Sequence, residues 1–190
     1  MPPKAKFLRS DMIDRTFDMV RNHGAEMISA RNVAVALGTS TAPIFTAFES
    51  IEELTRATKE KALEFYRANY LDEALRSELP FKAAGRNYIR FAKEEPELFK
   101  FLFMSEQDEM HESHYLPSGD PTSGEVLEAF MGNHNITAEA ARSIYNHLSV
   151  YTYGLAVLFA RRICVFTMDD VDRMLTELFW ALIAEKGSGK

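Results

Sequence analysis

The chain has 190 residues, 46% of them hydrophobic and 12% aromatic, so it is long and apolar enough to bury a sizeable core. This composition excludes a chain that is disordered throughout. Its 22 Lys and Arg are outnumbered by 28 Asp and Glu, which gives a formal net charge of −6. That balance argues against a uniformly basic nucleic-acid binder.

The charge is unevenly divided along the sequence. Residues 1–48 carry six basic and four acidic side chains, whereas residues 49–190 carry 16 basic and 24 acidic ones. A mildly positive N-terminal segment therefore precedes an acidic remainder, and the average conceals a small basic module.

Cysteine content and hydropathy both indicate a cytoplasmic protein. The single cysteine, Cys164, has no partner for an intramolecular disulfide, and no charged stretch followed by an apolar run opens the sequence. The uncharged run at residues 153–160 is followed at once by Arg161 and Arg162, far short of the ~20 residues that a spanning helix needs. We expect no membrane partner.

Apolar residues recur at helical spacing almost throughout, which predicts an all-α fold of about nine helices. The first helix is expected over residues 8–23 and ends at Gly24. The second covers residues 30–37, with Ser29 as N-cap and Gly38 as terminator. A short third helix follows Ser40, and its apolar residues four apart are expected to point inward: Ile44 and Phe48.

A capping box at Ser50 and Glu53 predicts the start of a long helix at Ile51. In such a box the serine side chain accepts from the Glu53 amide, and the Glu53 carboxylate reaches back to the Ser50 amide. No Gly or Pro interrupts the sequence as far as Arg76. This helix is expected to bridge the N-terminal and C-terminal regions.

The C-terminal region reads as further helices around one irregular segment. Helices are expected at 81–94, 97–103, 125–131, from Thr137 to about Arg162, and after a cap formed by Thr167 and Asp170. Residues 105–121 hold two prolines, a glycine and several acids, and so predict a functional or mobile loop. Residues 187–190 are expected to be a disordered tail.

The turn Gly38-Thr39-Ser40 joins two short helices that follow a bracing helix, which are the dimensions of a helix-turn-helix. An ordinary helical hairpin has the same spacing. The side chains favour the former. Residues 12–58 contain, in this order, Ile13 and Phe17, His23-Gly24-Ala25-Glu26, Ser29 to Ala34, Leu37 to Ser40, Pro43-Ile44-Phe45, Phe48 and Glu52-Glu53-Leu54. With these runs the segment resembles the TetR family of transcriptional regulators.

The resemblance implies a helix-turn-helix domain at residues 1–50 and a ligand-binding and dimerisation domain at 51–186. Residues 41–47 would be the recognition helix in the major groove, with Thr and Ala methyl groups suited to thymine. Lys4, Lys6 and Arg9 would serve as a basic arm. The implied DNA-binding residues are Ser29, Arg31, Thr39, Ser40, Thr41, Ala42, Phe45 and Thr46.

Three positions depart from the family pattern in ways that remove phosphate contacts. Phe45 stands where a tyrosine is common, Ala47 where a histidine is frequent, and Ile51 where a lysine usually meets the DNA backbone. DNA binding is therefore expected to be modest and to have a shallow salt dependence. Arg31 has an ordinary alternative, since a solvated surface arginine looks the same in sequence.

Beyond residue 60 the likeness is architectural and includes the segment Tyr151 to Gly154. It implies a pocket for a small hydrophobic or aromatic effector, lined by Tyr66, Tyr70, Tyr88, Phe91, Phe103, Phe130, Tyr145 and Tyr151. It also implies a homodimer formed by the last two helices, with an interface of Gly154, Leu158, Leu175, Leu178 and Leu182. Burial within one subunit explains each of these side chains equally well.

Other functions have weaker support in the sequence. His111 and His114 lie among acidic residues, but their spacing on an expected loop is a weak metal signal, and a solvated acidic loop is the simpler interpretation. Cys164 has no recognisable base partner and reads as a buried thiol. We therefore predict a homodimeric repressor without cofactor or enzymatic activity. The alternative is a helical ligand-binding or scaffold protein with vestigial DNA binding, and an enzyme is third.

Overall fold

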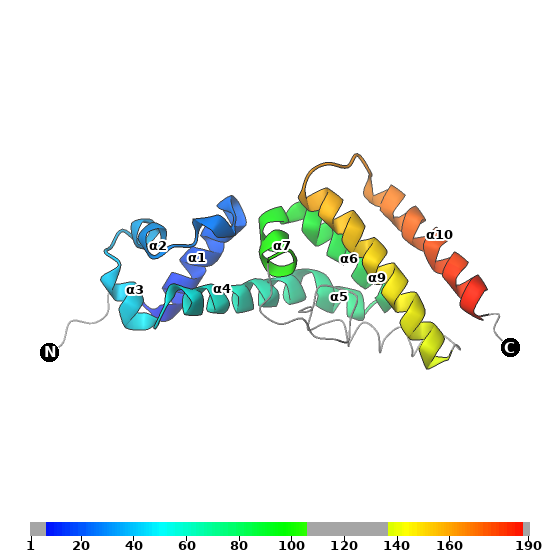
Figure 1. Ribbon diagram of the computed structural model, residues 1–190, viewed down its shortest axis with the longest axis horizontal. Helices are drawn as coiled ribbons and strands as arrows, with labels where there is room; N and C mark the ends of the chain where they lie inside the picture. The colour runs from blue at the N-terminus through cyan, green and yellow to red at the C-terminus, as the bar shows by residue number, and fades with distance from the viewer. Residues whose placement is uncertain (1–6, 106–136, 188–190) are drawn as a thin grey trace.

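The computed structural model describes residues 7–105 and 137–187, and within these ranges the chain is all-helical. The predicted all-α fold is confirmed. The helix expected at 125–131 and nearly all of the expected loop lie outside the described residues, as do Lys4, Lys6, His111, His114 and Phe130. Figure 1 shows an elongated molecule whose two ends are bridged by one long helix.

Three helices form the N-terminal end: α1 (Arg9–His23), α2 (Ala30–Leu37) and α3 (Ala42–Ala47). The Ser29 side chain accepts a hydrogen bond from the Asn32 amide at 3.2 Å, as expected for the N-cap of α2. Gly38 ends α2 with φ of 67°, a left-handed conformation that glycine adopts without a Cβ penalty. The sequence therefore sets both ends of α2 and the turn into α3.

The N-terminal helices enclose a small core that is separate from the main one. It consists of Met12, Val33, Ala34, Ile44, Phe48 and Leu54. Ile44 and Phe48 are 0% and 2% exposed, which confirms their inward direction. Farther along α1, Phe17 and Val20 belong instead to the main core of the C-terminal helices. Helix α1 is thus shared by both cores, and packing continues across the domain boundary expected at residue 50.

The bridge is a continuous helical run of three parts: α4 (Ile51–Tyr66), a π turn (Arg67–Leu71) and α5 (Asp72–Leu75). Ser50 caps α4 as predicted, accepting from the Glu53 amide at 3.3 Å. The other half of the box differs from the prediction. The Glu53 carboxylate accepts from the Glu49 amide at 2.7 Å and pairs with Arg9, because Arg9 of α1 lies beside it.

The π turn is held by a neighbouring helix, α6 (Pro80–Glu94). Asn87 is 8% exposed and its side-chain amide donates to the Tyr70 carbonyl at 2.8 Å. A buried carbonyl without a donor is unfavourable, so this bond stabilises the turn. No local signal predicted the π turn, because residues 67–71 contain no Gly or Pro.

We expect Asn87→Leu to lower the free energy of unfolding by about 1–3 kcal/mol, since the Tyr70 carbonyl would lose its buried donor. Urea denaturation followed by circular dichroism measures this. Asn69→Ala is the control, because Asn69 makes the same kind of bond from an exposed position, donating to the Phe65 carbonyl at 2.7 Å. Water can replace that donor, so its effect should be near zero. Equal losses in the two variants would contradict the assignment.

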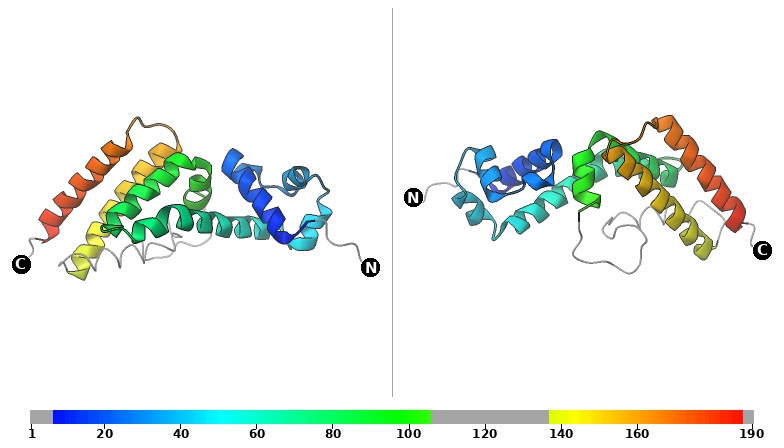
Figure 2. Two further views of the ribbon diagram at one scale, coloured as in Figure 1. Left: turned by 180° about the vertical axis from the view of Figure 1, so that it is seen from behind. Right: turned by 45° about the horizontal axis from the view of Figure 1, so that its top comes forward.

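The remaining described helices are α7 (Pro96–Phe103), α9 (Ala138–Ala160) and α10 (Met168–Gly187). Thr137 caps α9 and Thr167 caps α10 as expected, the latter accepting from the Asp170 amide at 3.1 Å. Helix α10 includes Gly187, one residue beyond its predicted end. Helices α6, α9 and α10 pack side by side, as the left view of Figure 2 shows. No helix among the described residues has the length and hydropathy to span a bilayer.

Candidate nucleic-acid interface

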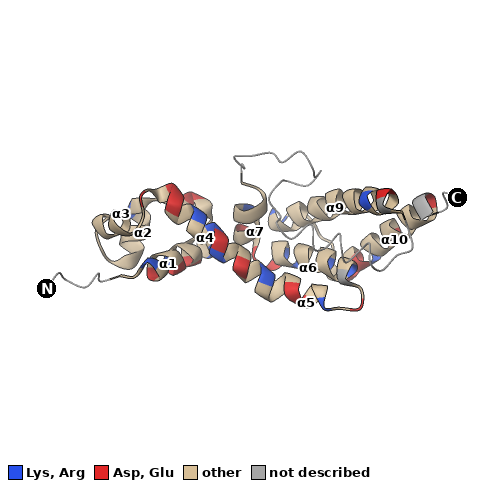
Figure 3. Ribbon diagram, turned by 90° about the horizontal axis from the view of Figure 1, so that it is seen from below, with Lys and Arg blue, Asp and Glu red and all other residues tan. Residues whose placement is uncertain are grey.

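Helix α3 presents one face to solvent and the other to the N-terminal core. Thr41, Ala42, Phe45 and Thr46 are exposed, with Phe45 at 54%, and they fall in two adjacent rows of residues four apart. Figure 3 shows α3 without any charged segment. The face is therefore neutral and consists mostly of methyl groups and one aromatic ring.

The other predicted contact residues lie on α2 and on the turn. Arg31 is exposed, and no ion pair joins its guanidinium to another residue in the described part of the chain. Ser40 is exposed, while Ser29 and Thr39 are half-buried, with Ser29 occupied in capping α2. The structure thus places all eight predicted residues in the helix-turn-helix segment, with Arg31 as its available cation.

Arg9 does not behave as part of a flexible arm. It begins α1, donates to the Ala47 carbonyl at 2.6 Å, pairs with Glu53 at 2.6 Å and lies 4.0 Å from the Phe48 ring centroid. Hydrogen bonding to Arg9 also lowers the pKa of Glu53. Arg9 therefore connects the end of α3 to α1 and α4, and its positive charge is already paired with the Glu53 carboxylate.

A second arginine joins the N-terminal helices to the C-terminal ones. Arg21, near the end of α1, forms a two-point ion pair with Glu95, the residue between α6 and α7, with a 2.8 Å bond from Nε to Oε2. This hydrogen bonding raises the pKa of Arg21. The guanidinium also lies 4.9 Å from the Phe65 ring centroid on α4. Arg21 thus ties α1 to the α6–α7 junction.

A polar recess of about 440 Å³ opens beside this ion pair. Its walls come from the end of α1, the α6–α7 junction and Arg162, which follows α9 and has φ of 56°. The lining residues are Asp18, Arg21, Asn22, Glu94, Glu95, Pro96, Glu97 and Arg162. Its charged walls differ from the apolar pocket that the sequence predicted.

Five of the predicted effector-contacting residues gather in one aromatic group at the centre of the main core. This ring cluster consists of Tyr66, Tyr70, Tyr88, Phe91 and Phe103, together with Phe99. Neighbouring ring centroids are 5.0–6.3 Å apart, as in the Tyr66–Phe91, Tyr66–Phe103 and Tyr88–Phe103 pairs. The rings therefore pack against one another, as aromatic cores do.

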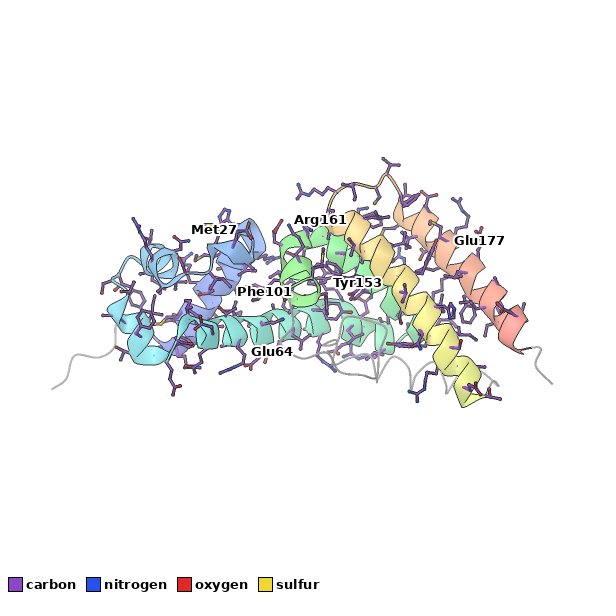
Figure 4. The ribbon with its side chains drawn as sticks, viewed as in Figure 1. Met27, Glu64, Phe101, Tyr153, Arg161 and Glu177 are labelled. Carbon is purple, nitrogen blue, oxygen red and sulfur yellow. The ribbon has the colours of Figure 1, made fainter. Side chains whose placement is uncertain are left out.

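Two phenol groups at the edge of the cluster have polar partners. The Tyr70 hydroxyl donates to Glu94 at 2.9 Å, and burial together with this bond raises the pKa of Tyr70. Tyr153 of α9 donates to the Phe103 carbonyl at 3.3 Å, and Figure 4 shows Tyr153 directed toward α7. Both hydroxyls remain protonated donors at neutral pH.

Two other predicted effector residues lie away from the cluster. Tyr145 is buried in the N-terminal half of α9, with its ring centroid 5.9 Å from that of Phe81. Tyr151 is half-buried against the main core. The family resemblance implied that these aromatics line one pocket, but a sequence pattern does not tell which of them share one place along the bundle.

Of the predicted dimer residues, Gly154 is exposed and has nothing near its missing Cβ. Leu175 and Leu182 are each only 7% exposed, because they pack α10 against the chain's own helices. Leu158 and Leu178 are half-buried in those same packing groups. Leu175 and Leu182 therefore belong to the subunit interior, while Leu158 and Leu178 keep part of their surface exposed.

The apolar side chains that α9, α10 and their connection leave in solvent are different ones. Val150 on α9 is 52% exposed and Trp180 on α10 is 62% exposed. In the connection, Ile163 and Val165 are 70% and 95% exposed. Sequence reasoning missed them because it singled out leucines at helical spacing on α10. Trp180 falls outside that row, and the other three residues lie outside α10.

The described residues contain no group of three or more His, Cys, Asp or Glu side chains placed to hold a metal ion. Cys164 is half-buried against the main core, so it is less covered than the buried thiol that the sequence predicted. The sequence matches no protein-family model, and no curated protein is significantly similar to it.

Proposed function

We propose that this protein is a homodimeric, ligand-responsive DNA-binding regulator of the TetR type, acting as a repressor. The observation that carries the proposal is the exposed helix α3. It follows α2 through a left-handed glycine and is anchored by Ile44 and Phe48 beneath it. This is the arrangement in which a recognition helix can enter a major groove.

The links between the two ends of the molecule support ligand response. Helix α4 runs from beside α3 to the ring cluster, and Arg21 ties α1 to the α6–α7 junction. An effector that separates the rings of the cluster would move α6 and α7, and hence α1. Differential affinity for two such arrangements would shift their populations and change DNA binding.

Binding of the purified protein to DNA flanking its own coding sequence, compared with random duplex at several salt concentrations, tests the proposal. We expect preferential binding and a slope of log affinity against log salt near −0.9 per phosphate contact. The slope should be shallow, because Arg9 and Arg21 are already paired with carboxylates. Equal affinity for the two DNAs would contradict sequence-specific regulation.

We expect Arg31→Ala to weaken DNA binding and to reduce the salt slope by about one phosphate contact per subunit. Its melting temperature should not change, because the side chain is exposed and outside the ion pairs of the described chain. Fluorescence anisotropy and thermal denaturation measure the two quantities. Arg142→Ala on α9 removes the same charge from another exposed position and should leave DNA binding intact. Unchanged binding in Arg31→Ala would remove Arg31 from the interface.

The absence of charge on α3 favours a second candidate, a helical ligand-binding or scaffold protein whose DNA binding is vestigial. Phe45, Ala47 and Ile51 provide no phosphate ligand. In a structure of the dimer, recognition helices that cannot reach successive major grooves, ~34–36 Å apart, would favour this candidate.

A further inference from the structure

The exposed face of α3 has a chemical character that restricts what it can recognise in DNA. The helix Ala42–Ala47 contains no Arg, Lys, Asn, Gln, Asp or Glu. The usual bidentate readers of guanine and adenine, namely arginine, lysine, asparagine and glutamine, are therefore missing from it. Among the four base pairs, the apolar group in the major groove is the C5-methyl of thymine.

The hydroxyl of Thr46 is already occupied within the helix. Its Oγ1 donates to the Ala42 carbonyl at 2.9 Å, so its hydrogen is unavailable to a base acceptor. Ala42 lies one helical turn earlier in the same row, and Phe45 lies in the neighbouring row with 54% of its surface exposed. What these three side chains offer to a partner is mainly methyl and ring surface.

We propose that Ala42, Phe45 and Thr46 recognise the C5-methyl groups of thymine, so that the preferred operator half-site is defined by thymines rather than by guanines. This inference rests on the proposed function and specifies its partner. Phosphate contacts from Arg31 supply affinity without sequence information, while the methyl contacts supply the discrimination. Burying one methyl corresponds to about a fourfold change in affinity.

The test begins with duplexes that the full-length protein selects from a random pool. The preferred duplex is resynthesised with deoxyuridine in place of thymidine, one position at a time, which removes the methyl and keeps the base pair. We expect about a fourfold loss at each contacted position and about 15-fold for two together. Anisotropy at constant salt gives the affinities.

A matched pair of variants assigns the effect to α3. Thr46→Ser removes the methyl and keeps the hydroxyl, so it should bind thymine and uracil duplexes equally at one position. Thr46→Val keeps methyl groups and removes the hydroxyl, so it should retain the preference for thymine. Phe45→Ala should lose the preference at a neighbouring position, and Arg31→Ala should weaken binding to both duplexes by the same factor.

The outcomes separate this inference from the proposed function. If the protein distinguishes selected from random DNA but binds thymine and uracil duplexes equally, thymine recognition is wrong while the regulator proposal stands. If Thr46→Ser and Phe45→Ala both keep the full preference for thymine, its assignment to α3 is wrong. Equal binding to selected and random DNA, as expected if the face docks on a protein, overturns both proposals.

Discussion

Trp180→Asp is expected to dissociate the proposed dimer and to lower operator affinity by about 10²- to 10⁴-fold, because two linked half-site contacts would become independent ones. Trp180 is 62% exposed on α10, and an indole that far in solvent is the largest apolar group these helices offer to a second copy. Sedimentation velocity measures the dissociation and anisotropy measures the affinity.

The control for Trp180→Asp is Ser77→Asp, which adds the same charge at an exposed position beyond α5. It should remain dimeric and bind DNA like the unmodified protein. Circular dichroism should show the same helix content in both variants as in the unmodified protein, since neither position is buried. A Trp180→Asp protein that remains dimeric would place the dimer interface elsewhere on the molecule.

Phe91→Ala is expected to lower the free energy of unfolding by about 3–5 kcal/mol, the usual loss for removing a buried aromatic ring. Phe91 is 0% exposed, and its ring centroid lies 5.0 Å from those of both Tyr66 and Tyr70. Removing it leaves a cavity at the centre of the ring cluster. Urea denaturation of the purified protein measures the loss.

Phe91→Leu provides the comparison, because it keeps most of the apolar volume and should lose less stability than the alanine variant. A change below about 1 kcal/mol for Phe91→Ala would mean that the ring borders open space, as it would in a preformed effector pocket. The same experiment therefore distinguishes a packed cluster from an open site.

Local signals in the sequence predicted the starts of four helices and the end of α2. Ser29, Ser50, Thr137 and Thr167 each accept a hydrogen bond at the start of a helix, as their spacing to the first turn indicates. Gly38 ends α2 because its backbone is left-handed there. These are interactions between residues a few positions apart, so the sequence contains both partners within one short window.

What the sequence did not predict depends on partners far apart in the chain. Arg9 was expected in a basic arm, but Glu53 and the Ala47 carbonyl hold it in place. Leu182 was expected at a dimer surface, but it packs against α9. An amphipathic pattern shows that a residue is covered and does not show by what. The turn into α3 and the inward direction of Ile44 and Phe48 were predicted better, because turn and helix lie within about ten residues of the chain.

The π turn at Arg67–Leu71 also bears on how the chain tolerates changes in length. A π turn accommodates one residue more than an α-helix needs, while the helices on either side keep their phase. Removing an exposed residue there, such as Ala68, would let α4 and α5 join as uninterrupted α-helix with their buried faces unchanged. Elsewhere in the bridge, the same deletion would rotate every following side chain by about 100°. We therefore expect homologous chains that are one residue shorter to have lost that residue at this turn. Such chains would also not need a side-chain amide at the position of Asn87, whose role is to bond the turn.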